Sequence, residues 1–271
     1  MLDISLQPFL LRSIVASILI SISVFGSSPF VAMRNLSFLV VEVAHAILCG
    51  AALGLFLNKL MFFEVIDPIW LALAFSVFFG LLTGYLGEKR EMEMVIGVLF
   101  ALNMALAVLF MSLIPTSDLP KIWGYLIGDL FLLTENDLYL LLLSSTLVGL
   151  LAILFWKEFT YISFDEEGAA AHGMNTRVYH YLMILSISIA TVSAVRAIGA
   201  ILVYALMVVP GVVALELAST TSWISIFSFL FAFISLLFGV SSSLFTGLPP
   251  SGIIGVILFL IYLTIIIKKK L

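Results

Sequence analysis

Long apolar stretches separated by short polar breaks run the length of the chain. A helix needs about 20 mostly apolar residues to cross ~30 Å of hydrocarbon. The predicted spans are residues 9–29, 38–58, 68–86, 94–114, 138–156, 179–195, 198–217, 223–244 and 251–267. Residues 179–217 admit a second interpretation, in which one helix is followed by a broken one. The pattern predicts an all-α, polytopic transmembrane helical bundle of eight or nine spans, forming a single domain over residues 1–271.

Composition narrows the class of protein. The chain is 63% hydrophobic and 10% charged, whereas soluble domains carry about 25% charged residues. This excludes a soluble enzyme and a disordered chain, and 12 Lys+Arg against 16 Asp+Glu leaves no basic surface for nucleic acid. The first residues have neither a basic region nor a cleavage site, so the first stretch is expected to be a retained span. We expect a multi-pass protein of the cell membrane, embedded in the lipid bilayer.

The basic residues indicate an orientation, since cytoplasmic breaks carry an excess of Lys and Arg. With nine spans, one side holds eight of them and the other holds three. The side with more Lys and Arg includes the C-terminal tail, so the N-terminus is expected outside and the C-terminus in the cytoplasm. The outer break 115–137 is expected to be a loop, because it contains several Pro, Gly and Asp residues. No Gly-x-x-x-x-Gly-Lys-[Ser/Thr] phosphate loop occurs, so nucleotide hydrolysis must come from another chain.

Ionisable side chains inside a span are costly and are candidates for function. Glu42, His45 and Cys49 lie on one stripe of the second predicted span, at i, i+3 and i+7. Carboxylate, imidazole and thiolate are ligands of zinc and other first-row divalent ions. These three residues are therefore candidate metal ligands. The alternative is a Glu–His pair that neutralises itself, with Cys49 as a small apolar filler.

A neighbouring stripe on the same span holds Ala46, Gly50 and Gly54. Small residues at this spacing let helices approach closely. The second span is therefore expected inside the bundle, where its polar stripe would line a path.

The cytoplasmic break 157–178 is predicted to contain a short helix within residues 164–174. Acidic residues suit the positive N-terminal end of a helix, and Gly suits its C-terminal cap. Asp165, Glu166, Glu167 and Gly173 are candidate partner-binding residues. The alternative is a solvated surface helix with no partner. His172 and His180 are expected at the surface.

Six short segments follow one another along the chain. They are Arg34-Asn35-Leu36-Ser37-Phe38 with Ala44-His45-Ala46 and Gly50, Glu93-Met94-Val95-Ile96-Gly97, Tyr125 to Leu130 with Thr134 and Asp137-Leu138, Phe164-Asp165-Glu166 with Ala169 and Gly173, Gly199-Ala200 and Leu202 to Pro210, and Pro250-Ser251-Gly252. In this order they resemble the permease subunits of ATP-binding-cassette importers for zinc, manganese and iron. The resemblance implies a paired permease or homodimer, two cytoplasmic ATP-binding subunits and an extracytoplasmic metal-binding protein.

Two positions depart from the family. Members usually carry Asp four residues before the His, where this chain has Val41, so only His45 inherits the metal-path role by position. Glu42 is its neighbour and a substitute on the grounds of spacing. The fourth span often carries His or Ser where this chain has Ala101 and Leu102, and Asn103 is the strongly polar residue nearby. These departures indicate an altered metal preference or a divergent member that carries something else.

Import of a divalent metal by alternating access is the leading hypothesis. The ion is then the transported substrate, no cofactor is bound permanently, and the chain itself is not an enzyme. The alternative is a stand-alone secondary carrier coupled to an ion gradient. Such a carrier needs coupling carboxylates in several spans, and Glu42 is the available one.

Overall fold

The computed structural model describes residues 8–61, 67–88 and 90–270, which form helices and no strand. Eight helices are long and apolar enough to cross a membrane within these ranges. They are α1 (Pro8–Met33), α2 (Ser37–Met61), α3 (Pro68–Gly87), α4 (Met92–Leu113), α6 (Glu135–Leu154), α9 (Thr176–Leu217), α10 (Thr221–Thr246) and α11 (Pro250–Lys270). Short helices α5 (Leu119–Ile127), α7 (Trp156–Phe164) and α8 (Glu166–Ala171) and the 3₁₀ turns η1 (Thr116–Asp118) and η2 (Leu130–Leu132) connect them. The predicted all-α transmembrane bundle is confirmed.

Helix α9 is too long for a single crossing, because 42 residues at 1.5 Å each extend about 63 Å. It is broken at Gly199, whose φ of 82° and ψ of 155° are not helical. Near its start, Arg177 pairs with Glu88 at the end of α3. Just before the break, Arg196 pairs with Asp137 in the first turn of α6, at the opposite end of the bundle.

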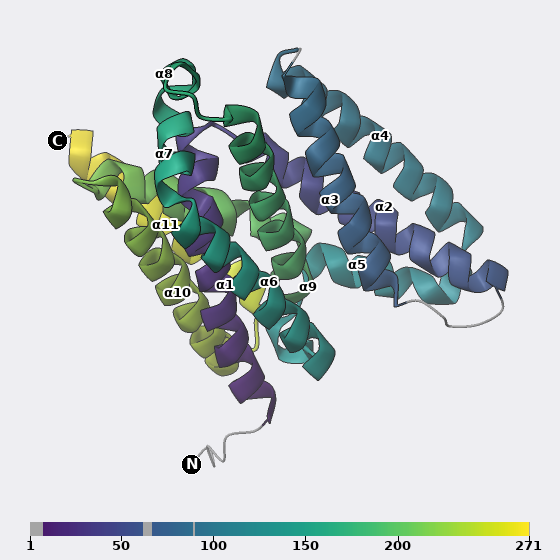
Figure 1. Cartoon of the computed structure of the whole chain (residues 1–271). Coiled ribbons are helices and arrows are strands. Elements are labelled where there is room, and N and C mark those ends of the chain that lie inside the picture. The colour runs from purple at the N-terminus through teal and green to yellow at the C-terminus, as the bar shows by residue number, and fades with distance from the viewer. Residues whose placement is uncertain (1–7, 62–66, 89, 271) are drawn as a thin grey trace.

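The second half of α9 returns to the end at which the helix began. Gly211 packs against the Ser28 backbone near the end of α1, and Glu216 pairs with Lys269 at the end of α11. Helix α9 therefore crosses twice, so eight long helices make nine crossings. The start of α1 and the end of α11 accordingly lie at opposite ends of the bundle (Figure 1). The predicted break between the sixth and seventh spans, residues 196–197, lies two residues before the observed break at Gly199.

The long helices form two groups that meet along α9. Helix α2 packs against α3 and α4, whereas α1 packs against α6 and α10. Figure 1 shows α2, α3 and α4 on one side of the molecule and α10 and α11 on the other. Because α9 contacts both α1 and α2, its broken centre lies between the groups. This arrangement buries α2 more than most of the spans.

The predicted close-packing stripe of α2 faces α3. A Cβ atom built on Gly50 would lie 2.7 Å from the Ala72 Cα, and one on Gly54 would lie 2.9 Å from the Pro68 Cα. Since real Cβ atoms do not approach so closely, both positions require glycine. The stripe thus brings the backbones of α2 and α3 together and holds the polar side chains of α2 inside the protein.

The outer segment 115–137 differs from the expected loop, since it contains α5 and both 3₁₀ turns. Helix α5 buries Ile122 and Tyr125, and its end meets the break in α9. Gly128 and Gly199 both have positive φ and lie backbone to backbone, with no room for a Cβ on either. Turn-forming residues cluster here because the chain reverses at both ends of a short helix.

Candidate functional site

The centre of the site is Glu42, which lies on α2 between α3 and α4. Its side chain has no exposed surface. The Thr83 hydroxyl of α3 donates to Oε2 at 3.2 Å, and the Asn103 amide of α4 donates to Oε1 at 2.9 Å. Glu42 therefore lies inside the α2–α3–α4 group and is not turned toward the acyl chains.

His45 lies one turn further along α2, and its ring is held in one orientation. The ring packs edge-on against Phe100 of α4, with centroids 5.0 Å apart. Its Nδ1 lies 2.8 Å from the Val41 carbonyl oxygen. Because a carbonyl only accepts hydrogen bonds, this contact places a proton on Nδ1, and in the neutral ring Nε2 then keeps its lone pair. A histidine that binds a metal commonly donates its other nitrogen to a backbone carbonyl in this way.

The hydrogen bonds of these two side chains do not join them, so the self-neutralising Glu–His pair is not formed in the described structure. Cys49 is fully buried within the hydrophobic core. Seven residues separate it from Glu42, about 10 Å along the helix axis, which is too far to share one ion. Among the described residues, no three His, Cys, Asp or Glu side chains gather to hold a metal. The predicted stripe is therefore not a preformed ligand cluster.

Thr83 was not singled out by the sequence, although it touches Glu42. A threonine inside an apolar span is common and does not by itself indicate a functional site, because its hydroxyl can donate to a backbone carbonyl of its own helix. Asn103 had a stronger signal, as an amide in a span that is otherwise almost wholly apolar. The structure shows that both are fully buried and both contact Glu42.

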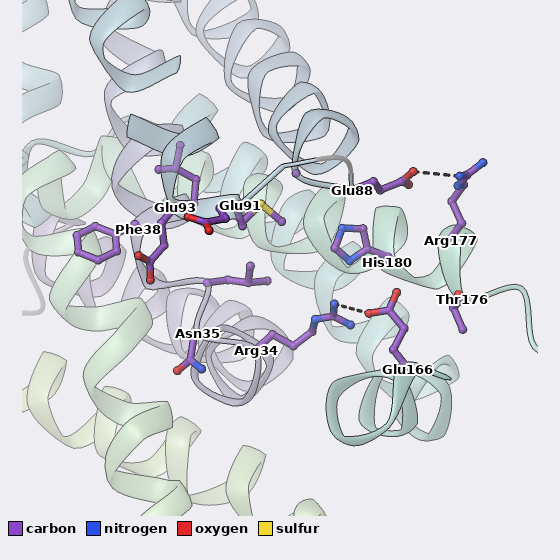
Figure 2. A pocket seen from close by; sticks show the side chains of 14 residues that line it. Arg34, Asn35, Phe38, Glu88, Glu91, Glu93, Glu166, Thr176, Arg177 and His180 are labelled. Atoms are coloured by element: carbon purple, nitrogen blue, oxygen red, sulfur yellow. Dashed lines mark hydrogen bonds and ion pairs between the residues drawn. The ribbon is translucent and has the colours of Figure 1, made fainter. Parts of the chain in front are cut away.

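A cavity of about 810 Å³ opens at the end of the bundle, between the α1–α2 turn, the end of α3 and the starts of α4, α8 and α9. Arg34 pairs with Glu166 at 2.8 Å, and Arg177 pairs with Glu88 at 3.1 Å (Figure 2). The cavity is named the cytoplasmic pocket after the side expected from the Lys and Arg asymmetry. Its charged lining residues are Arg34, Glu88, Glu91, Glu93, Glu166 and Arg177. Among the described lining residues, four carboxylates stand against two guanidinium groups, and such an excess of negative charge attracts cations.

His180 of α9 also lines the cytoplasmic pocket. Its expected surface position was wrong, because only 6% of the residue is exposed. The burial arises because the first turns of α9 are covered by α8 and the end of α3. His172 is exposed as expected, and its Nδ1 lies 3.0 Å from the Tyr161 hydroxyl.

The predicted short helix after α7 is present as α8. The Asp165 carboxylate accepts a hydrogen bond from the Gly168 amide at the start of α8. At its end, the Gly173 amide donates to Ala170 and the Met174 amide donates to Ala169. This pattern is a Schellman cap with Gly173 in the left-handed region.

The four candidate partner-binding residues are all exposed around α8. They are Asp165, Glu166, Glu167 and Gly173. Arg34 anchors this segment from the α1–α2 turn, since it also donates to the Ile162 carbonyl of α7 at 2.9 Å.

A second cavity, of about 780 Å³, lies at the opposite end beside α5 and the break in α9. Arg196 is its central charge. Its guanidinium contacts the Asp137 carboxylate at 3.0 Å and donates to the Tyr125 hydroxyl at 2.9 Å. Asp67 and Asp129 also line this outer pocket, but each carboxylate accepts a hydrogen bond from the backbone at the start of α3 or η2.

The chain is similar in sequence to named membrane transport proteins and in fold to a solved structure. The manganese transport system membrane protein MntC of Listeria innocua is 28% identical over 263 residues, covering 94% of this chain and 90% of that protein. The high-affinity zinc uptake system membrane protein ZnuB of Buchnera aphidicola is 25% identical and covers 87% of this chain and 88% of its own. A chain of PsaBC from Streptococcus pneumoniae, solved in complex with a Fab, superposes with a TM-score of 0.81 at 21% identity, covering 96% of this chain and 91% of that one.

These comparisons agree with the structure on the class of protein. The long apolar helices and the membrane transport relatives make this a multi-pass membrane protein. The resemblance drawn from the six short segments is confirmed, because the profile of the ABC 3 transport family matches residues 6–269. The chain belongs to the ABC 3 transport family.

Proposed function

We propose that this chain is the membrane-spanning permease subunit of an ATP-binding-cassette importer. Its substrate is a divalent transition-metal ion (zinc, manganese or iron), which it moves into the cytoplasm by alternating access. The relatives named for manganese transport and zinc uptake support this class of substrate. The observation that carries the proposal is the fully buried Glu42 carboxylate on α2, with His45 one turn away.

A buried carboxylate is costly in a membrane protein and persists where it has a function. Glu42 supplies negative charge and the Nε2 atom of His45 supplies a neutral nitrogen ligand. Both ligand types suit first-row divalent ions. Because the two residues alone leave a coordination shell incomplete, a passing ion is held weakly enough to leave again. A second copy of the permease, water molecules or neighbouring oxygen atoms complete the shell during transit.

The partners follow from the two ends of the bundle. The cytoplasmic ATP-binding subunits dock on α8, where Asp165, Glu166, Glu167 and the turn at Gly173 are exposed. The extracytoplasmic metal-binding protein docks at the opposite end, around α5 and the outer pocket. The permease acts as a homodimer, and no cofactor is bound permanently.

The small number of buried carboxylates favours this importer over a stand-alone ion-coupled carrier. Glu42 and Asp137 are the buried carboxylates among the residues described. Asp137 is already paired with Arg196 and caps the start of α6. One available carboxylate does not supply the coupling sites that a carrier needs in several helices.

The proposal is tested by uptake in cells whose own permease is replaced by variants. Radiolabelled Mn²⁺, Zn²⁺ and Fe²⁺ are each supplied at limiting concentration. Glu42→Ala and His45→Ala are expected to lower the uptake rate of the transported ion by at least about tenfold, the scale of a lost ligand contact. Membrane levels of each variant are measured by immunoblot.

Gly97→Ala serves as a control, since Gly97 lies on α4 with open space around it. It should leave uptake unchanged. Undiminished uptake of all three ions by both the Glu42 and the His45 variant would refute the assignment of the path.

A further inference from the structure

The Glu42 carboxylate is the meeting point of three helices. Thr83 of α3 and Asn103 of α4 each direct a polar group at a different carboxylate oxygen, at 3.2 Å and 2.9 Å. All three side chains have no exposed surface. This oxygen cluster, made of Glu42, Thr83 and Asn103, uses different side chains from the Glu42–His45–Cys49 stripe predicted on α2.

Two features leave the oxygen cluster chemically incomplete. The Asn103 Oδ1 atom is buried and has no hydrogen-bond partner, although nearly all buried polar atoms in proteins have one. The carboxylate also lacks a basic partner, since none of the ion pairs in the described part of the chain includes Glu42. In the structure the Nδ2 group of Asn103 faces Glu42 Oε1, so the unused Oδ1 becomes a ligand beside the carboxylate when the amide turns over, and a cation would then complete the cluster.

The spacing of the cluster suits an octahedral ion. In such a shell with metal–oxygen distances of about 2.1 Å, neighbouring ligand atoms lie about 3.0 Å apart. The distances from the Glu42 oxygens to Thr83 and Asn103 bracket this value. A half-turn of the Asn103 amide exchanges its nitrogen and oxygen without changing its shape. Its Oδ1 atom then takes the place beside Glu42 Oε1.

We propose that Glu42, Thr83 and Asn103 form a transit site for a hard divalent cation, and that Thr83 and Asn103 make the permease prefer Mn²⁺ to Zn²⁺. Carboxylate, amide and hydroxyl oxygens suit Mn²⁺, whereas nitrogen and sulfur ligands suit Zn²⁺. The inference rests on the proposed function and deepens it, because it names the residues that select among the transported ions.

The cytoplasmic pocket provides the exit from this site. Phe38, Gly87 and Ile96 line the pocket. They stand one turn from Glu42 on α2, one turn from Thr83 on α3 and two turns from Asn103 on α4. The site therefore lies directly beyond the floor of the pocket on all three helices. The excess carboxylates of the pocket draw a released cation toward the cytoplasm.

The test compares the uptake of two ions by the intact permease complex in proteoliposomes. Asn103→Leu and Thr83→Val remove an oxygen while nearly keeping the side-chain volume, and they leave Glu42 and His45 in place. Each is expected to lower the ratio of Mn²⁺ to Zn²⁺ uptake by about tenfold. Ser76→Ala is the matched control, because it removes another buried hydroxyl two turns away on α3. It should leave the ratio unchanged.

Conservative variants guard against a loss of folding. Thr83→Ser keeps the hydroxyl and Asn103→Gln keeps a neutral amide oxygen, so both should retain the wild-type preference for Mn²⁺. An unaltered ratio in Asn103→Leu and Thr83→Val would overturn the inference, as would an equal loss of both ions that tracks the thermal stability of the variants. If the wild-type complex takes up no divalent ion, the proposed function fails as well. Wild-type uptake with an unaltered ratio in the variants overturns the inference alone.

Discussion

At the scale of single residues, the sequence identified the charged member of the site and missed one of its neighbours. Glu42 was apparent because an acid inside an apolar span has few interpretations. Thr83 was not, because which helix faces Glu42 depends on packing between spans. That packing is set by Gly50, whose missing side chain lets α3 approach α2.

Gly50→Ala is therefore expected to destabilise the protein. Its Cβ would lie 2.7 Å from the Ala72 Cα atom, where backbone and not a flexible side chain must move. Overpacking of this kind costs about 1–3 kcal/mol, measured as a lower midpoint of thermal unfolding in detergent. Gly97→Ala is the comparison, since a Cβ there meets nothing within 4 Å. Equal midpoints for the two variants would contradict this account of α2–α3 packing.

At the scale of elements, the turn between α1 and α2 connects the predicted docking helix to the site. Arg34 donates to the Ile162 carbonyl of α7 and pairs with Glu166 of α8, and α2 begins three residues later. Acids at the start of a helix and a glycine at its end predicted α8 correctly from local sequence. Helix α5 was not predicted, because Pro120 and Gly124 within its nine residues and Gly128 directly after it are typical of loops.

Loss of the Arg34 contacts is expected to uncouple ATP hydrolysis from transport. The Arg34 side chain is only 16% exposed and also donates to the Ile162 carbonyl, so Arg34→Ala is expected to lower the unfolding midpoint while leaving the protein folded. The same variant should hydrolyse ATP but move fewer ions per ATP. Parallel assays of phosphate release and ion uptake measure this ratio. Arg177→Ala, which removes the more exposed pair with Glu88, is the control. An unchanged ratio in Arg34→Ala would show that this contact does not transmit motion of α8.

At the scale of the whole molecule, the hydrophobic pattern was enough to predict the helical bundle, and the charge asymmetry adds a prediction of its orientation. The length of an apolar stretch and the placement of Lys and Arg are set by the membrane and not by packing between helices. Both can therefore be used for prediction without a tertiary structure. The hydrophobic pattern did not decide between eight and nine crossings. It depends on the backbone of Gly199, where α9 reverses between the two helix groups against Gly128.

Because α9 crosses the membrane twice, the structure predicts which loop residues a reagent outside the cell can label. In a Cys49→Ala background, single cysteines replace Glu135, Leu248, Glu167 or Lys269, all of which are exposed. A membrane-impermeant maleimide applied to intact cells should label the first two positions and spare the last two. If α9 crossed once, the labels at Leu248 and Lys269 would be exchanged. Permeabilised cells, in which all four positions should react, provide the control.

The central claim is that a divalent ion passes the buried Glu42 carboxylate under the drive of ATP. The most direct measurement is the initial rate of ATP-dependent Mn²⁺ and Zn²⁺ uptake by the purified complex in proteoliposomes, with Glu42→Gln beside wild type. Glutamine keeps the shape and removes the charge. Its single oxygen can accept only one of the two hydrogen bonds that Thr83 and Asn103 donate to Glu42, and at its NH2 group the partner must accept instead. We expect uptake to fall by at least about tenfold while the ATPase rate and the unfolding midpoint stay near wild type. Wild-type uptake of both ions by Glu42→Gln would contradict the claim.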